Sequence, residues 1–337
     1  MVALLKTTQI QEPSSASVNL TLDTSGNGTF AGTSVMSSPY TMRNKIINGA
    51  MQIWQRGTSF SGVSSGSYTA DRMYIGYTGS APTVTQVAGS TGFTYAARVT
   101  GAVGNTLTTF GQKIESVNCA DLVSKTVTIS AVLLASSSQT FTWSIFYANS
   151  TDNFSASTQI ATGSWSVTTS ATTYTATVTL PSQAANGLQF QIYPASAGAF
   201  TSGTFDVTGL QLERGTVATP FEYRNYQQEL AMCQRYYVLT NPSNTSRGGG
   251  LTGSMYSTTA ANVFGTFPVP MRTAPTVTAG GTSNTFYIST VSSTASATFS
   301  GFGSTINNTF SELSAVTTAT VGLPLQYNGQ LSATAEL

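Results

Sequence analysis

The sequence predicts an all-β protein, and three observations lead to that class. Apolar and polar residues alternate with period two in runs such as Lys125–Leu134 and Thr140–Tyr147, which is the pattern of strands with one buried face. Turn-forming residues separate these runs at short spacing, as in antiparallel sandwiches. Only 7% of the 337 residues are charged, and threonine, which favours strands, is abundant. We therefore expect a β-sandwich or jelly roll.

Residues 1–45 are expected to form an extended N-terminal segment. Ser17–Leu22 alternates with period two, a turn cluster follows at residues 23–28, and Thr29–Val35 reads as a second short strand. A lone hairpin with so little apolar surface is marginally stable. This segment therefore needs another copy or a docking surface.

Residues 46–222 are expected to form one β-sandwich. Besides the two strands named above, three further sets of apolar residues alternate: Tyr174, Ala176, Val178 and Leu180; Leu188, Phe190 and Ile192; and Phe205, Val207, Leu210 and Leu212. The last set slips by one residue at Gly209, which predicts a β-bulge.

One helix is predicted, over residues 223–235, as a link between two β domains. Pro220 is a start signal. Four residues recur at helical spacing and form a single face: Tyr226, Leu230, Cys233 and Tyr237.

Residues 236–337 are expected to form a C-terminal β domain. Their four charged residues are Arg247, Arg272, Glu312 and Glu336. The strands expected here are Tyr236–Thr240, Asn262–Val269, Thr276–Ala279, Thr285–Val291 and Ala295–Phe299.

Charge and composition exclude several classes of function. A net charge of +1 does not indicate the basic surface that binds nucleic acid. The chain has no histidine, which removes histidine catalysis and histidine-ligated metals. No stretch approaches the ~20 apolar residues of a membrane span, so no membrane insertion is expected. The N-terminus does not resemble a secretory signal, which predicts synthesis in the cytoplasm of the cell that makes the protein.

The acidic residues do not suggest an active site. Polysaccharide hydrolysis usually needs two carboxylates ~5–9.5 Å apart, and no spacing in this sequence marks such a pair. We expect no catalytic residue, no cofactor and no metal, because Asp206 has no acidic cluster around it to hold calcium. Cys119 and Cys233 are expected to be reduced, packed thiols.

Sugar binding requires less of a sequence: an aromatic ring to stack on, and amides or hydroxyls for hydrogen bonds. Trp143 and Trp165 alternate with polar residues and are expected in the core. Trp54 precedes Gln55-Arg56-Gly57 and is the weak candidate for a glycan contact, although a core position is again favoured.

Four stretches together resemble a module of bacteriophage tail fibres and related virion appendages: Asn44–Phe60, Tyr68–Arg72, Phe205–Arg224 and Glu229–Tyr237. The first and last strands implied here also resemble those of carbohydrate-binding jelly rolls. The resemblance implies a virion structural protein, commonly a homotrimer, with a lectin-like sandwich. Residues 1–45 would attach to other virion proteins, and residues 236–337 would be the distal tip.

On this basis we expect non-covalent adhesion to a host-surface glycan. Two alternatives stay open: a purely structural head or collar fibre or adaptor, and a polysaccharide depolymerase. The face formed by Tyr226, Leu230, Cys233 and Tyr237 could pack around a three-fold axis or on the sandwich. The scarce charges, including Asp71 with Arg72 and Glu213 with Arg214, are expected to form ion pairs within the domain rather than to contact a ligand.

Overall fold

The computed structural model describes residues 9–10, 20–22, 24, 28–30, 42–90, 92–194, 198–240, 252–258, 260–288, 294–296, 298–304, 308–314 and 324–337. The chain divides into two compact units, Met1–Met42 and Arg43–Leu337. The first unit contains an antiparallel sheet of β1 (Gln9–Ile10), β2 (Leu20–Leu22) and β3 (Gly28–Phe30), in that order. Of the predicted strand at residues 29–35, residues 31–35 lie outside the described residues.

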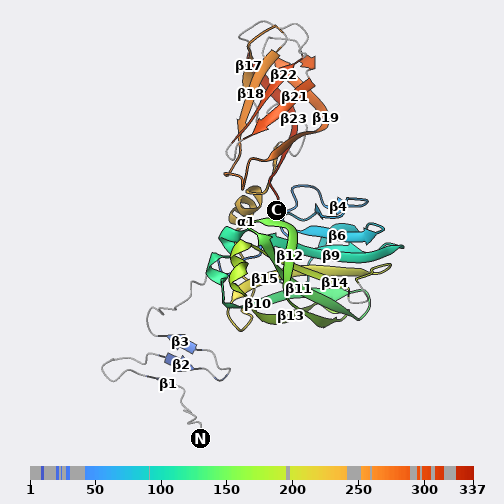
Figure 1. The fold of residues 1–337 in the computed structure, drawn as a ribbon, viewed down its shortest axis with the longest axis vertical. Coiled ribbons are helices and arrows are strands. Elements are labelled where there is room, and N and C mark those ends of the chain that lie inside the picture. Colours follow the sequence, from blue (N-terminus) through green and yellow to red (C-terminus); the bar gives the residue numbers. More distant parts are fainter. Residues whose placement is uncertain are drawn as a thin grey trace. The chain divides into compact units, whose positions relative to one another are not determined.

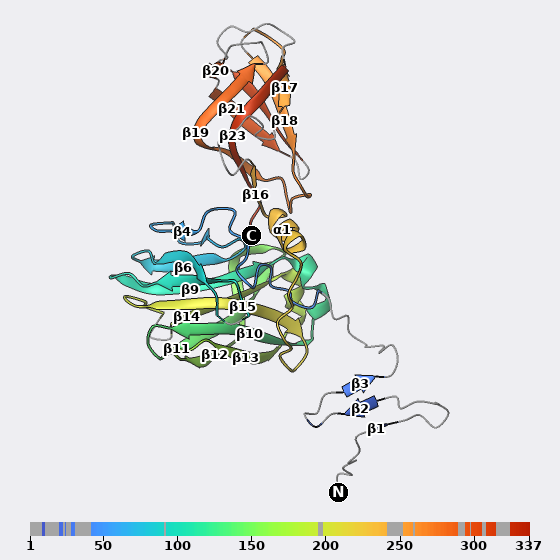
Figure 2. The ribbon, with the colours of Figure 1, turned by 180° about the vertical axis from the view of Figure 1, so that it is seen from behind.

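Two six-stranded antiparallel sheets form the β-sandwich (Figure 1, and from behind in Figure 2). The first sheet has the order β13 (Thr172–Thr179), β10 (Thr126–Ala135), β15 (Thr204–Arg214), β8 (Tyr95–Thr100), β7 (Thr83–Ala88) and β4 (Ser59–Phe60). The second has the order β12 (Asn153–Val167), β11 (Gln139–Ser150), β14 (Leu188–Pro194), β9 (Asn105–Ile114), β6 (Tyr74–Gly79) and β5 (Ser67–Tyr68). From β8 onward the chain passes repeatedly between the sheets, as in a jelly roll.

The core lies between the two sheets, and the alternating apolar residues predicted from the sequence fill it. The sets on β10, β14 and β15 are buried. Trp143 and Trp165 are buried as well, as predicted, and their ring centroids lie 6.2 Å apart. Tyr174 extends this aromatic stack across to the first sheet, 6.0 Å from Trp165. The stack closes one edge of the sandwich.

The bulge predicted at Gly209 is confirmed. The pairing of β10 with β15 shifts register between Ser130 and Val132, opposite Gln211 and Thr208. Gly209 adopts φ +59°, a left-handed conformation that glycine takes without a steric cost. The extra residue returns Leu210 and Leu212 to the core after the slip.

The helix is shorter than predicted. α1 runs from Tyr226 to Gln234, and the side chain of Asn225 caps it by accepting a hydrogen bond from the Gln227 N–H, 2.9 Å away. This cap fixes the start of the helix at Tyr226, beyond the position that Pro220 suggested. Tyr237 was placed on the helix by its spacing, but it lies at the start of β16, after the helix has ended.

A third large sheet follows the helix, with β16 pairing at one end of β23. Its strands are β16 (Tyr237–Thr240), β17 (Thr252–Met255), β18 (Ala260–Thr266), β19 (Thr276–Ile288), β20 (Thr294–Ser296), β21 (Thr298–Ser304), β22 (Asn308–Ser314) and β23 (Pro324–Thr334). Two predicted strands, at 276–279 and 285–291, belong to the single strand β19. The predicted strand at 295–299 is divided between β20 and β21. Arg247 lies outside the described residues.

Candidate functional site

The outer face of the second sheet carries neutral polar side chains, which we name the amide face: Tyr74, Ser144, Thr162, Gln189 and Gln191. The apolar residues of β6, β9, β14 and β11 point into the core. Because side chains alternate along a strand, the residues between them point to the opposite face. Gln189 and Gln191 are half-buried there.

The amide face contains one continuous row across the sheet. Backbone pairing places Tyr74 beside Gly111, Gly111 beside Gln191, Gln191 beside Ser144, and Ser144 beside Thr162. A Cβ at Gly111 would collide with the carbonyl oxygen of Phe190. The position therefore needs glycine, and no side chain separates Tyr74 from Gln191.

Hydrogen bonds fix the orientation of the polar groups. The Tyr74 hydroxyl donates to Gln191 Oε1 at 3.0 Å, and Gln189 Nε2 donates to the Tyr74 hydroxyl at 2.8 Å and to Gln191 Oε1 at 3.1 Å. Burial raises the pKa of Tyr74 and keeps its hydroxyl neutral. The Gln191 amide N–H groups and the Gln189 carbonyl have no hydrogen-bond partner within the described part of the chain, so both are available to a ligand.

Aromatic rings and one lysine flank the row. Tyr193 pairs with Thr142 and Phe146 pairs with Gln189, and both rings are half-buried. Lys113 Nζ lies 5.9 Å from the Tyr74 ring centroid and donates to the Leu337 carbonyl at 2.9 Å. Burial, and then the nearby Arg72, lower the pKa of Lys113.

Trp54, the glycan-contact candidate from the sequence, lies elsewhere. Its ring is half-buried against the core and stacks on Phe60 with centroids 6.3 Å apart. Its indole N–H donates to the Met51 carbonyl at 2.7 Å. These contacts account for Trp54 as a packing residue, without a ligand.

The four residues expected to form one helical face, Tyr226, Leu230, Cys233 and Tyr237, are divided between the interior and the surface. Cys233 is fully buried with Ile47, Ile53 and Tyr236, and Leu230 packs against this group. Tyr237 is 8% exposed. Of the two arrangements left open by the sequence, Leu230 and Cys233 pack on the sandwich side. Tyr226 is 52% exposed and is the member available to another copy.

Residues from three of the four stretches that resemble phage fibres meet Glu336 in a buried group, which we name the junction cluster. Its members are Arg56, Asp71, Arg72, Tyr236, Tyr237 and Glu336. The Arg56 guanidinium lies 3.6 Å over the Tyr237 ring and 2.9 Å from the Glu336 carboxylate. Arg72 lies 3.6 Å over the Tyr236 ring and also pairs with Glu336. The cluster joins the sandwich to the end of the chain after β23.

These contacts confirm that the scarce charges form ion pairs within the protein, and they correct two of the expected partners. Asp71 pairs with Arg56 at 3.6 Å rather than with its neighbour Arg72. Burial raises the pKa of Asp71, and attraction to Arg56 opposes that shift. The partner of Arg72 is Glu336, beyond the sandwich in sequence, because the chain returns there after β23. Glu213 pairs with Arg43 at 3.4 Å.

The remaining described carboxylates also have partners, and Glu222 pairs with Arg224 at 3.6 Å. Asp152 accepts hydrogen bonds from Ser116, Glu229 pairs with Arg224, and Glu115 binds Arg235 and the Tyr236 hydroxyl. Asp121 pairs with Lys45, and Asp206 pairs with Arg98. The side chain of Glu312 lies outside the described residues. Within the described residues, no group of three acidic or cysteine side chains could hold a metal ion.

Both cysteines are free and buried, as predicted. Burial raises the pKa of Cys119 to about 12 and raises that of Cys233 well above its usual value. Neither thiol is therefore a nucleophile at neutral pH. Among the described helices, none is long and apolar enough to cross a membrane.

No protein-family model and no curated protein matches the chain. Among solved structures, a family-4 carbohydrate-binding module matches 50% of this chain and 98% of its own, with 19% identity and a TM-score of 0.35. The enzymatically active domain of tailspike protein 4 from bacteriophage CBA120 matches 51% of this chain but only 22% of its own, with 16% identity and a TM-score of 0.36. A family-61 carbohydrate-binding module in complex with β-1,4-galactotriose matches 51% of this chain and 99% of its own, with 9% identity and a TM-score of 0.33. Likenesses this distant assign neither a family nor a ligand.

Proposed function

We propose that this protein is a non-catalytic glycan-binding component of a virion appendage, and that its sandwich binds a neutral glycan on the amide face. The observation that carries the proposal is the pair of half-buried amides, Gln189 and Gln191, which hydrogen bonds with the buried Tyr74 hydroxyl orient. Sugar hydroxyls both donate and accept, so amide and hydroxyl groups match them. The flanking rings of Tyr193 and Phe146 offer apolar surface for the C–H groups of a sugar.

The charges favour a neutral ligand. Lys113 is the one cation among the residues described on this face, and it is committed to the Leu337 carbonyl. Exposed charges separated by more than a Debye length are screened by salt, whereas neutral hydrogen bonds are not. Adhesion through the amide face should therefore survive high ionic strength, and its collapse on addition of salt would contradict a neutral glycan.

The experiment is a binding titration of the full chain against neutral oligosaccharides, with Gln191→Ala as the test variant. Loss of one hydrogen bond to a ligand costs about 0.5–1.5 kcal/mol, so we expect affinity to fall roughly two- to twelvefold. Gln183→Ala is the matched control, because Gln183 is exposed in η3 (Ser182–Asn186). Equal affinities for both variants would remove the amide face as the binding site.

The absence of catalysis is part of the proposal. Each acidic side chain described between residues 71 and 229 has an ion-pair or hydrogen-bond partner, which supports a structural role over a free acid–base pair. Incubating capsule polysaccharide with the protein tests this point. Release of shortened chains would overturn the proposal in favour of a depolymerase.

Virion localisation, host attachment and a homotrimer rest on the resemblance of residues 44–60, 68–72, 205–224 and 229–237 to phage fibres. Light scattering on a sizing column should give three times 35.1 kDa, and a clean monomer would contradict the trimer. Three linked copies would raise weak affinity by about 10²–10⁴ through avidity. Purified protein should compete with virions for host cells, whereas a purely structural fibre or adaptor would not.

A further inference from the structure

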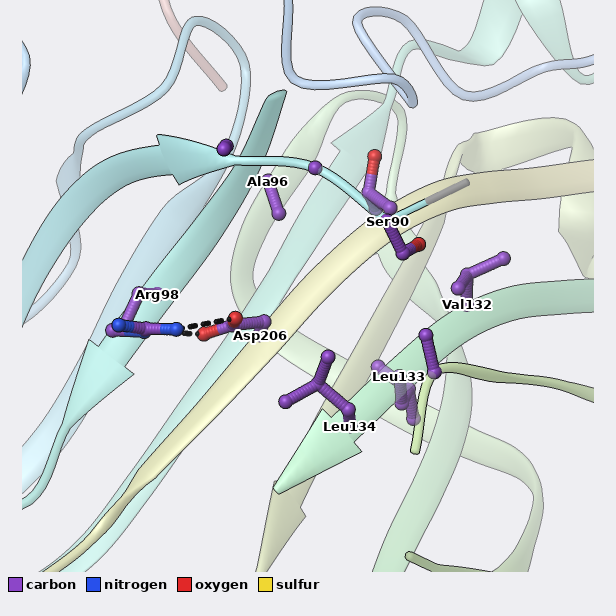
Figure 3. A pocket seen from close by; sticks show the side chains of 11 residues that line it. Ser90, Ala96, Arg98, Val132, Leu133, Leu134 and Asp206 are labelled. Atoms are coloured by element: carbon purple, nitrogen blue, oxygen red, sulfur yellow. Dashed lines mark hydrogen bonds and ion pairs between the residues drawn. The ribbon is translucent and has the colours of Figure 1, made fainter. Parts of the chain in front are cut away.

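A pocket opens on the outer face of the first sheet, which is the sheet opposite the amide face (Figure 3). Its volume is about 230 Å³, below the ~300–1,000 Å³ of drug-sized ligand sites, and it fits a single small ring. Strands β8, β10 and β15 and the β7–β8 loop supply its walls. The residues that matter here are Ser90, Arg98, Val132, Leu134, Asp206 and Thr208.

An ion pair with two parallel hydrogen bonds lies in this pocket. Arg98 Nε and Nη2 donate to the two oxygens of Asp206 at 2.7 and 2.8 Å, as the dashed lines in Figure 3 mark. The Arg98 side chain is 41% exposed and that of Asp206 is 8% exposed. Unlike the junction cluster, this pair faces an open cavity. Arg98 Nη1 takes no part in the pair, and each Asp206 oxygen keeps a lone pair for another donor.

Phe93 and the pocket residue Val132 both lie close to Gly209, and the ring of Tyr223 packs on Phe93. A Cβ on Gly209 would lie 2.7 Å from the Phe93 ring and 3.0 Å from Val132, so Phe93 adjoins the Val132 wall. Tyr223 lies 5.6 Å from Phe93, is 56% exposed, and donates its hydroxyl hydrogen to the Gly92 carbonyl. That bond fixes the ring without covering it.

We propose that this pocket is a second ligand site, which takes one neutral sugar unit through two adjacent hydroxyls. One hydroxyl donates to Asp206 and its neighbour accepts from Arg98 Nη1. Val132 and Leu134, which line the pocket, contact the C–H groups of the ring. The site is separate from the amide face, so the sandwich would hold a glycan on each of its two outer faces.

The paired charges select the class of ligand. Arg98 and Asp206 cancel each other's charge, so the pocket offers no net attraction to an ion. A carboxylate on the sugar would be drawn to Arg98 but repelled by Asp206, and an ammonium group would meet the reverse. A neutral diol satisfies both groups at once. Neutral hexosides should therefore bind better than glucuronic acid or glucosamine.

The experiment titrates the full chain with methyl glycosides of glucose, galactose and mannose, followed by saturation-transfer NMR and calorimetry. Ala171→Tyr narrows the pocket without touching the ion pair, because Ala171 lines the pocket and is exposed. Ala185→Tyr is the matched control, on an exposed alanine of η3. We expect Ala171→Tyr to weaken binding at least tenfold, and Ala185→Tyr and Gln191→Ala to leave this site unchanged.

Asp206→Asn supplies a readout that a merely structural ion pair would not give. It leaves Arg98 uncompensated, so neutral hexosides should bind more weakly while glucuronic acid binds more tightly than to the unaltered protein. Unchanged binding in both Ala171→Tyr and Asp206→Asn would overturn the pocket. Loss of all binding in Gln191→Ala alone would also overturn the pocket as a ligand site, while supporting the amide face as the binding site. Failure of every glycan to bind would overturn both proposed sites.

Discussion

At the scale of single residues, Glu336 is a buried carboxylate that two arginines share. Its side chain is 6% exposed and pairs with both Arg56 and Arg72. Removing one partner from a buried ion pair is costly because the other charge stays buried without compensation.

We therefore predict that Glu336→Gln lowers the free energy of unfolding by about 3–5 kcal/mol, measured by urea denaturation. Asp121→Asn is the control, because Asp121 is 54% exposed and pairs with Lys45 at 2.8 Å. An exposed pair contributes about 0–1 kcal/mol. Equal losses in the two variants would contradict a special role for the junction cluster.

The two thiols give a second prediction at this scale. Cys119 and Cys233 are each 0% exposed, and burial raises the pKa of both. A thiol reagent at pH 8 should therefore leave the native protein unmodified and label both cysteines after unfolding. Fast labelling of the folded protein would show that the packing around one of them opens.

Sequence reasoning found the core residues but not the amide face. Gln189 and Gln191 are visible in the sequence as the polar positions between Leu188, Phe190 and Ile192. Their alternation indicates a shared outer face, yet it does not indicate that Tyr74, more than a hundred residues earlier, lies in the same row. Only the strand pairing brings them together. The sequence pointed to Trp54 instead, because an aromatic ring is the expected stacking partner of a sugar, but the structure packs Trp54 against the core.

At the scale of secondary structure, the bulge at Gly209 can be tested against a matched glycine. Gly209→Ala introduces a Cβ at φ +59° and 2.7 Å from the Phe93 ring, whereas Gly62 has φ +63° with nothing within 4 Å. Both variants carry the left-handed strain of about 1–2 kcal/mol, but only Gly209→Ala adds the clash. We predict a loss of stability at least 1 kcal/mol larger for Gly209→Ala in thermal denaturation. A loss no larger than that of Gly62→Ala would mean that Phe93 moves aside freely.

The helix cap provides another prediction for an element. Asn225→Ala removes the acceptor for the Gln227 N–H and should cost about 1 kcal/mol, while Asn225→Asp keeps the cap. Thermal denaturation of both variants separates the cap from other effects of the position. If Asn225→Asp is as unstable as Asn225→Ala, the cap is not what holds the start of α1.

Elements were predictable where one face is buried, and less so where it is not. β12 is the longest strand of the sandwich, but it lies at a sheet edge and most of its residues are exposed. Its Ser-, Thr- and Ala-rich sequence therefore lacks the apolar alternation that marks β10 and β14. The helix predicted over residues 223–235 was too long mainly at its start, because Pro220 suggested an earlier beginning whereas the Asn225 cap sets it at Tyr226.

At the scale of the whole molecule, the junction cluster should make the sandwich and the C-terminal sheet unfold together. Arg235 joins Glu115 of the sandwich at 2.8 Å, and Arg272 donates to the Ala335 carbonyl at 2.8 Å near the same place. We predict one calorimetric transition for the full chain and its separation into two in Glu336→Gln. Two transitions in the unaltered protein would contradict this coupling.

The sequence by itself determined the all-β class, the buried alternating strands, the bulge at Gly209, the reduced cysteines and the pairing of the scarce charges within the protein. Each of these follows from local periodicity, residue chemistry or composition. The tertiary structure decided which distant residues meet: Arg72 with Glu336, Tyr74 with Gln191, and Arg98 with Asp206. Strand order and register set those meetings, and they depend on the packing of the whole chain rather than on any local pattern.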